Sequence, residues 1–380
     1  MTDTTTAPGT APRTPRSFPT PHFTDAEAGA LVFPSSGSRS FSYYTPQKMR
    51  ASMYEDVTFD VQPDPERHLL QGWIYGFADG TAGYPQDWTR LRATDWHRFR
   101  DPNEEWEQTI YRNNANVVRQ IQQNLANARK ADAYQQWTPT WTHFVEHHVG
   151  AWMHAEQGLG MHVFVAIQRS APTNMINNAL AVNGTHKLRF AQDLALYNLD
   201  IEEQLPGFDG TAHIAAWQQD PAWQGVRETV ERLTAVEDWA QAAFAANLVF
   251  EPLVGELFRS HLVMQIAARN GDFTTPSVIG AGEGDYDRDL RWTRALFELL
   301  LTDEQFADAN RQVAAGWLET WLPRALDAAR RLQPLWSQAD EKPVRFEDSL
   351  DRAKDRLVRL LDGLGLSAPA LHGTPEGDRS

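Results

Sequence analysis

The stretch DPNEEWEQTIYRNNANVVRQIQQNLANA, residues 101–128, decides the fold class. Its apolar positions recur at intervals of three, four and seven residues, as on one face of an α-helix: Trp106, Ile110, Val117, Ile121, Leu125 and Ala128. Asp101 offers an acceptor at a helix N-cap, and Pro102 then takes the first helical position, where its missing N–H group is not needed. The stretch predicts a long amphipathic helix that begins near residue 102.

Similar signals recur along the chain. Thr138-Pro139 and Asp220-Pro221 repeat the cap followed by proline, and Thr302-Asp303-Glu304-Gln305 is a capping box. No segment alternates with a period of two for long enough to build a sheet, so we predict an all-α bundle. The expected helices lie near 102–130, 139–169, 174–204, 221–247, 251–269, 287–301, 303–333 and 345–362. The glycine-rich segment 280–284 is expected to be a loop.

The two ends of the chain differ from this pattern. Nine of the 22 prolines lie in the first 65 residues. We therefore expect residues 1–65 to form an extended arm, disordered to about residue 20, with 66–365 as the helical domain and 366–380 as a frayed acidic tail. Phe41, Tyr43 and Tyr44 form an aromatic cluster on the arm, which we expect to pack on the bundle or on a partner protein.

Composition excludes several classes of function. The net charge is −15, with 50 acidic and 35 basic residues, which argues against nucleic acid and anionic membranes as partners. The chain has no cysteine, so disulfides, thiolate nucleophiles and cysteine-ligated metals are excluded. No secretory signal and no run of 18 apolar residues is found. We expect a soluble protein of the cytoplasm.

The residues that precede the 12 histidines exclude one type of metal site. A helical bundle that binds two oxygen-activating metal ions draws ligands from two Glu-x-x-His pairs. In this chain no Glu or Asp stands three residues before any histidine. The sequence therefore predicts such a bundle without its metal ions.

One predicted helix concentrates titratable side chains: His143, Glu146, His147, His148, His154, Glu156 and His162. His143 and His147 are four residues apart, a spacing that suits zinc, but the spacing specifies no third ligand and we assign no metal. Glu156 falls on the apolar seam of this helix, so its carboxylate faces other helices. It is either a metal ligand or part of a satisfied polar network; His148 and His261 are expected to be ordinary core histidines.

Several motifs spread over the chain resemble those of a known family. They are Tyr43-Tyr44-Thr45-Pro46, Leu70-Gln71-Gly72-Trp73, Thr94-Asp95-Trp96, Arg100-Asp101-Pro102 with Trp106, Ala195-Leu196-Tyr197-Asn198, Pro206-Gly207-Phe208-Asp209, Asp238-Trp239, Phe250-Glu251-Pro252-Leu253-Val254-Gly255-Glu256, and Asn310-Arg311 with Trp317 and Trp321. Together they resemble the small (beta) subunit of the hydroxylase component of soluble di-iron monooxygenases, most like the actinobacterial propane monooxygenase type. The match runs from about residue 40 to about residue 360.

The resemblance implies a ferritin-like fold and a structural subunit with no catalytic, cofactor or metal-binding residue. It implies a large (alpha) subunit that holds the di-iron centre, in some cases a gamma subunit, and a two-fold symmetric hydroxylase. A coupling protein and an NADH-dependent reductase with FAD and an iron–sulfur cluster would bind transiently. By the same likeness, the arm with Phe41, Tyr43 and Tyr44 would contact the large subunit, and the complex would oxidise propane or a similar short alkane.

Two other interpretations stay open at this point. The chain could be an independent carboxylate-metal enzyme with a site around Glu156, His148 and His154, or a helical scaffold unconnected with oxygenation. The sequence does not identify the hydrocarbon, the surface that binds the large subunit, or the role of the His143–His162 cluster.

Overall fold

The computed structural model describes residues 48, 51–59, 88–339, 344–368 and 371. All regular elements in these ranges are helices, so the all-α prediction is confirmed. Within the same ranges, no helix is both long and apolar enough to cross a membrane.

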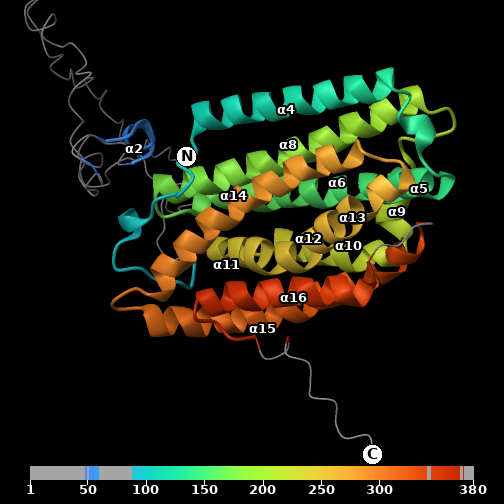
Figure 1. The fold of residues 1–380 in the computed structure, drawn as a ribbon. Coiled ribbons are helices and arrows are strands. Elements are labelled where there is room, and N and C mark those ends of the chain that lie inside the picture. Colours follow the sequence, from blue (N-terminus) through green and yellow to red (C-terminus); the bar gives the residue numbers. More distant parts are fainter. Residues whose placement is uncertain (1–47, 49–50, 60–87, 340–343, 369–370, 372–380) are drawn as a thin grey trace, which may run out of the picture.

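Long helices lie side by side in layers (Figure 1). They are α4 (Glu107–Lys130), α8 (Asn174–Gln204), α14 (Thr275–Leu301), α15 (Ala307–Arg331) and α16 (Phe346–Gly363), with the shorter α9 (Ala212–Gln219) and α10 (Pro221–Thr234). α4 covers α8, and α8 packs on α14. On the opposite side, α15 packs on α10. One apolar core joins all these layers.

Two composite helices form the middle of the bundle. The first, residues 139–170, consists of α5 (Pro139–Phe144), a π-helical stretch Val145–Val149, α6 (Gly150–Gln157), a π-helical stretch Gly158–Phe164, α7 (Val165–Ile167) and a 3₁₀ turn Gln168–Ser170. The second, residues 239–270, consists of α11 (Trp239–Ala243), a π-helical stretch Phe244–Gly255, α12 (Glu256–Phe258), a π-helical stretch Arg259–Val263, α13 (Met264–Ile266) and a 3₁₀ turn Ala267–Asn270.

The second composite helix contains a proline that an α-helix would not tolerate well. Pro252 has no N–H group, and its ring would clash with the carbonyl group of an α-helical turn. In the wider π-helical stretch Phe244–Gly255 the chain continues without a break, and every residue of the stretch is buried. The break that we predicted between residues 247 and 251 is therefore wrong; the chain breaks at 235–238 instead.

The first predicted helix boundary is also wrong. α4 begins at Glu107, with Trp106 at the N-cap, rather than at residue 102. Asp101 accepts a hydrogen bond from the Asn103 amide (2.8 Å) and so closes a turn instead of capping a helix. Glu104 then has φ of 50°, which a continuing helix cannot accommodate.

The predicted loop at 280–284 is helical, and it lies inside α14. A Cβ atom on Gly282 would lie 2.4 Å from the Phe190 ring, so the glycine allows α14 to approach α8 closely. Here glycine serves helix packing, not a turn. α9 is a further element that we did not predict.

The two terminal segments are described only in part. Phe41, Tyr43 and Tyr44 lie outside the described residues, as does most of the arm. Residues Met53–Thr58 form the short helix α2, capped by Ser52 and Glu55. α2 approaches the start of α8, where the Asn174 side chain donates to the Thr58 carbonyl oxygen (2.9 Å). Of the tail 366–380, Leu366, Ala368 and Leu371 are described and buried.

A buried ion-pair cluster as the candidate functional site

Five charged side chains meet at the centre of the bundle, each from a different segment. They are Glu156 from α6, Lys187 from α8, Glu251 from the π-helical stretch Phe244–Gly255, Arg259 from the next π-helical stretch, and Glu283 from α14. We call this group the ion-pair cluster. Four of its members are almost fully buried, and only Glu283, at the edge, has a side chain that is 19% exposed.

Glu156 and Glu251 each contact both cations. Lys187 Nζ lies 3.2 Å from Glu156 Oε2 and donates a hydrogen bond to Glu251 Oε1. Arg259 Nη1 donates to Glu156 Oε1 (3.1 Å), and Nη2 donates to Glu251 Oε2 (2.8 Å). The third guanidinium nitrogen, Nε, pairs with Glu283. Each carboxylate therefore bridges the ammonium and the guanidinium groups.

Aromatic rings and one glycine complete the surroundings. Trp152 Nε1 donates to Glu156 Oε1 (2.7 Å), and the Arg259 guanidinium lies 5.2 Å from the Trp152 ring centroid. A Cβ atom on Gly255 would lie 2.0 Å from Glu251 Oε2. A side chain at this position would displace the Glu251 carboxylate from Arg259.

Burial and charge pairing act in opposite directions on the pKa values. Burial raises the pKa of Glu156, although Lys187 and Arg259 reduce that effect. Burial also disfavours the charge on Glu251, but Arg259 and Lys187 outweigh it and lower the pKa of that carboxyl. For Lys187, burial is outweighed by Glu156 and Glu251, which raise the pKa of the ammonium group. The cations therefore stay charged, and Glu156 is more easily protonated than Glu251.

The cluster can be compared with the di-metal site of a four-helix carboxylate bundle. That site uses a Glu from each of two helices and a Glu-x-x-His pair from each of two others. Here Glu156 and Glu251 come from the two composite helices, while α8 supplies Gly184-x-x-Lys187 and α14 supplies Glu283-x-x-Tyr286. Both histidines of the template are replaced, and the carboxylates point at nitrogen cations. The residues present do not fit a pair of iron ions.

The structure separates the residues of the alternative enzyme site. Glu156 belongs to the ion-pair cluster. His148 is held between Gln338 (2.6 Å) and the Trp223 indole N–H (3.0 Å), and burial lowers its pKa to about 4. His154 instead contacts His213, with 2.9 Å between the ring nitrogens. The three side chains have no common partner and do not converge on a metal site. His261, half-buried, has a pKa lowered by burial.

Sequence reasoning identified Glu156 and missed its partners. Glu251 had a visible signal, because it is a charged residue in the middle of the apolar run 244–255. Lys187 and Arg259 had none, because a single Lys or Arg on a helix is usually exposed.

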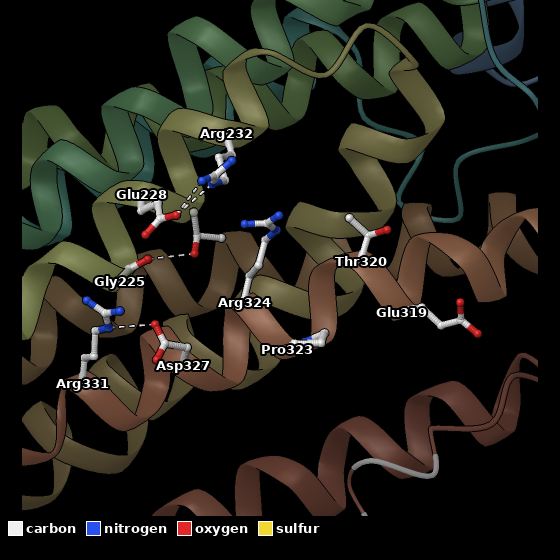
Figure 2. A pocket seen from close by; sticks show the side chains of 10 residues that line it. Gly225, Glu228, Arg232, Glu319, Thr320, Pro323, Arg324, Asp327 and Arg331 are labelled. Atoms are coloured by element: carbon white, nitrogen blue, oxygen red, sulfur yellow. Dashed lines mark hydrogen bonds and ion pairs between the residues drawn. The ribbon is translucent and has the colours of Figure 1, made fainter.

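One hollow on the surface of the described residues is lined mainly by charged side chains. It has a volume of about 640 Å³ and lies between α10 and α15 (Figure 2). It contains the ion pairs Glu228–Arg232 (2.8 Å) and Asp327–Arg331 (2.7 Å). A hydrocarbon requires an apolar pocket, so this hollow does not suit it.

The fold and the ion-pair cluster define a class of protein. It is a helical bundle that resembles the di-metal carboxylate bundles but pairs its central carboxylates with lysine and arginine side chains. Residues 73–304 match the family described as methane/phenol/alkene hydroxylase. The chain belongs to this family, as a small (beta) subunit of the hydroxylase component of a multicomponent monooxygenase. The resemblance predicted from the motifs is thereby confirmed.

Three relatives illustrate the range of similarity. The chain is 60% identical to the propane 2-monooxygenase hydroxylase small subunit of Rhodococcus jostii, over 95% of this chain and 98% of the relative. It is 27% identical to the methane monooxygenase component A beta chain of Methylococcus capsulatus, over 83% and 85%. A solved phenol hydroxylase chain from Pseudomonas sp. OX1 shares the fold with a TM-score of 0.71 at 19% identity, over 84% and 92%.

Proposed function

We propose that this chain is the structural subunit, without a di-iron centre of its own, of a hydroxylase that oxidises propane or a similar short alkane with O₂. The observation that carries the proposal is the ion-pair cluster, in which Lys187 and Arg259 saturate the central carboxylates. The di-iron centre would then belong to the large (alpha) subunit. The identity of 58–61% to propane 2-monooxygenase small subunits supports the choice of substrate.

The proposed assembly is a two-fold symmetric hydroxylase in the cytoplasm, with or without a gamma subunit. A coupling protein and a reductase that contains FAD and an iron–sulfur cluster would deliver electrons from NADH. Phe41, Tyr43 and Tyr44 are proposed contacts of the arm with the large subunit. Aromatic side chains suit such a contact because they bury much area at little entropy cost.

The physical role of the chain would be to hold its partner in place. Ligands of a metal pair must stay within about 0.5 Å of the productive geometry, which requires rigid support. A bundle whose centre is fixed by four buried ion pairs (Glu156 and Glu251, each to Lys187 and Arg259) offers a rigid surface for that purpose.

The proposal is tested by expressing this chain alone, the large subunit alone, and the two together. Iron is measured by elemental analysis, and propane oxidation is measured with reductase, coupling protein and NADH. We expect stoichiometric iron and full activity only in the co-expressed complex, and no iron in this chain alone. Stoichiometric iron in the isolated chain, or an equally active large subunit without it, would overturn the proposal.

A further inference from the structure

Three potential metal ligands meet on the surface, away from the ion-pair cluster. Where α5 passes into the π-helical stretch Val145–Val149, Glu146 Oε2 lies 3.7 Å from His143 Nδ1 and 3.3 Å from His147 Nδ1. The centroids of the His143 and His147 rings are 3.9 Å apart. Within the described residues, this is the only group of three such side chains whose ligand atoms all lie within 4.8 Å of one another.

These distances are close to those of a tetrahedral zinc site. Zinc bonds of about 2.0–2.1 Å to nitrogen and oxygen place neighbouring ligand atoms about 3.3 Å apart. The spacing of His143 and His147 specified two ligands and no third. In the structure the third candidate ligand is Glu146, because its carboxylate lies beside both imidazole rings.

The carboxylate is held in position by a neighbouring loop. Glu146 Oε1 accepts a hydrogen bond from the Asp209 amide (2.5 Å), which leaves Oε2 for a metal ion. Hydrogen bonds of this kind orient the ligands of metal sites. His147 Nδ1 lies 3.0 Å from the His143 carbonyl oxygen. Metal binding at Nδ1 would replace that contact, with the ring proton at Nε2.

The site is open to ions from solvent. The side chains of His143, His147 and Glu146 are 64%, 30% and 14% exposed. Both histidines border a hollow of about 460 Å³. This space can hold a water molecule as the fourth ligand.

We propose that His143, Glu146 and His147 bind one divalent transition-metal ion, preferentially Zn²⁺, with water in the remaining position. Two neutral imidazoles and one carboxylate match the ligand preference of zinc. Through the Glu146–Asp209 hydrogen bond, the ion would connect the start of the first composite helix to the loop after α8. The proposal is independent of the iron chemistry assigned to the large subunit.

The test is a calorimetric titration of the full-length chain, without an affinity tag and freed of metal by EDTA, with Zn²⁺. We expect saturable binding of one ion per chain. His143→Ala, His147→Ala and Glu146→Gln should each weaken binding about tenfold or more. His162→Ala is the matched control, because His162 is exposed on the same composite helix and should leave the affinity unchanged.

A second measurement separates loss of the site from loss of the fold. Circular dichroism should show the same helicity in all variants, and Co²⁺ should give the visible absorption of a tetrahedral site in the wild type only. No saturable Zn²⁺ binding, or equal binding by the double variant His143→Ala/His147→Ala, would overturn the proposal. Neither result depends on iron or on propane oxidation.

Discussion

Two buried clusters of polar side chains meet α8 at adjacent residues, and they differ in composition. Lys187 enters the ion-pair cluster, whereas the preceding His186 enters a network in which its Nδ1 lies 2.8 Å from Asp289 Oδ1. Asn183 donates to the same Asp289 (3.0 Å), and Asn247 donates to Asn183 (2.7 Å). We call this second group the amide network. Two of its four members, Asn183 and Asn247, are neutral amides and the other two form one ion pair, while every member of the cluster is a charged residue type.

The difference predicts how each group responds to the loss of one member. Removing a charge from the cluster leaves an opposite charge buried without its partner, which destabilises a protein strongly. Removing one hydrogen bond from the amide network leaves a dipole unpaired, which has a smaller effect. Helix α8 therefore contributes to one group in which a substitution should lower stability strongly and to another in which it should lower stability less.

The largest effect is expected for Arg259→Met. Methionine fills much of the space, but Glu156, Glu251 and Glu283 all lose a cationic partner. We expect the free energy of unfolding to fall by about 3–5 kcal/mol, measured by urea denaturation of the full-length chain. A loss below about 1 kcal/mol would show that the cluster is not held by charge pairing.

The next effect concerns coupling inside the cluster. Lys187→Met and Glu156→Leu each remove one partner of the buried Lys187–Glu156 pair and leave the other with one ion-pair partner fewer, whereas the double variant removes one charge of each sign. We expect the double variant to be more stable than the sum of the single losses by about 1–3 kcal/mol. Additive losses would contradict the pairing of Lys187 with Glu156.

In the amide network, Asn247→Leu should have a smaller effect. Asn183 Oδ1 loses the Asn247 donor but still accepts from the Trp292 indole N–H (3.2 Å), so we expect a loss of about 1–2 kcal/mol in the same urea experiment. A loss as large as that of Arg259→Met would remove the distinction between the two groups.

The smallest effect is a dependence on pH. Burial raises the pKa of Glu256, beside the cluster, to about 8, and Asp289 raises the pKa of His186 despite its burial. Between about pH 7 and 8 Glu256 and His186 keep protons in the folded chain that the unfolded chain has released, so stability falls as pH rises. We expect about 1 kcal/mol per pH unit.

The pH effect has a control within the same chain. Glu256→Gln removes one of the two titrating groups and should flatten the decline when unfolding midpoints are compared at about pH 7.0, 7.5 and 8.5. His148 and His154, with pKa values lowered to about 4, stay neutral in the folded chain; in the unfolded chain they lose their protons near pH 6.5, which opposes the decline mainly below this range. Stability that rises over this range would contradict the assignment.

The fold was largely predictable, because periodic apolar residues indicate helices whatever their partners are. The seam of α4, from Ile110 to Ala128, was identified in this way. Gly282 was misread as part of a loop because its role depends on Phe190, a residue of another helix. The break expected near Pro252 was wrong for a similar reason, since tertiary packing stabilises the π-helical turn.

The site was predictable only in part. Glu156 was recognised because a carboxylate on an apolar seam needs a partner. Lys187 and Arg259 were not recognised, because they are 72 residues apart in sequence and meet only in the folded chain. The third ligand at His143 and His147 was missed for the same reason, since the direction of the Glu146 side chain follows from the π-helical turn and the Asp209 loop.

The π-helical stretches make the spacing of the second composite helix sensitive to its length. Deleting one residue between Glu251 and Arg259 would turn the following side chains around the helix axis by about 100° where the helix is α-helical, with 3.6 residues per turn, and by less where it is π-helical. The guanidinium group would then point away from the carboxylates. Variation in this segment is therefore expected to proceed by exchange of residues, with insertions and deletions confined to the connecting loops.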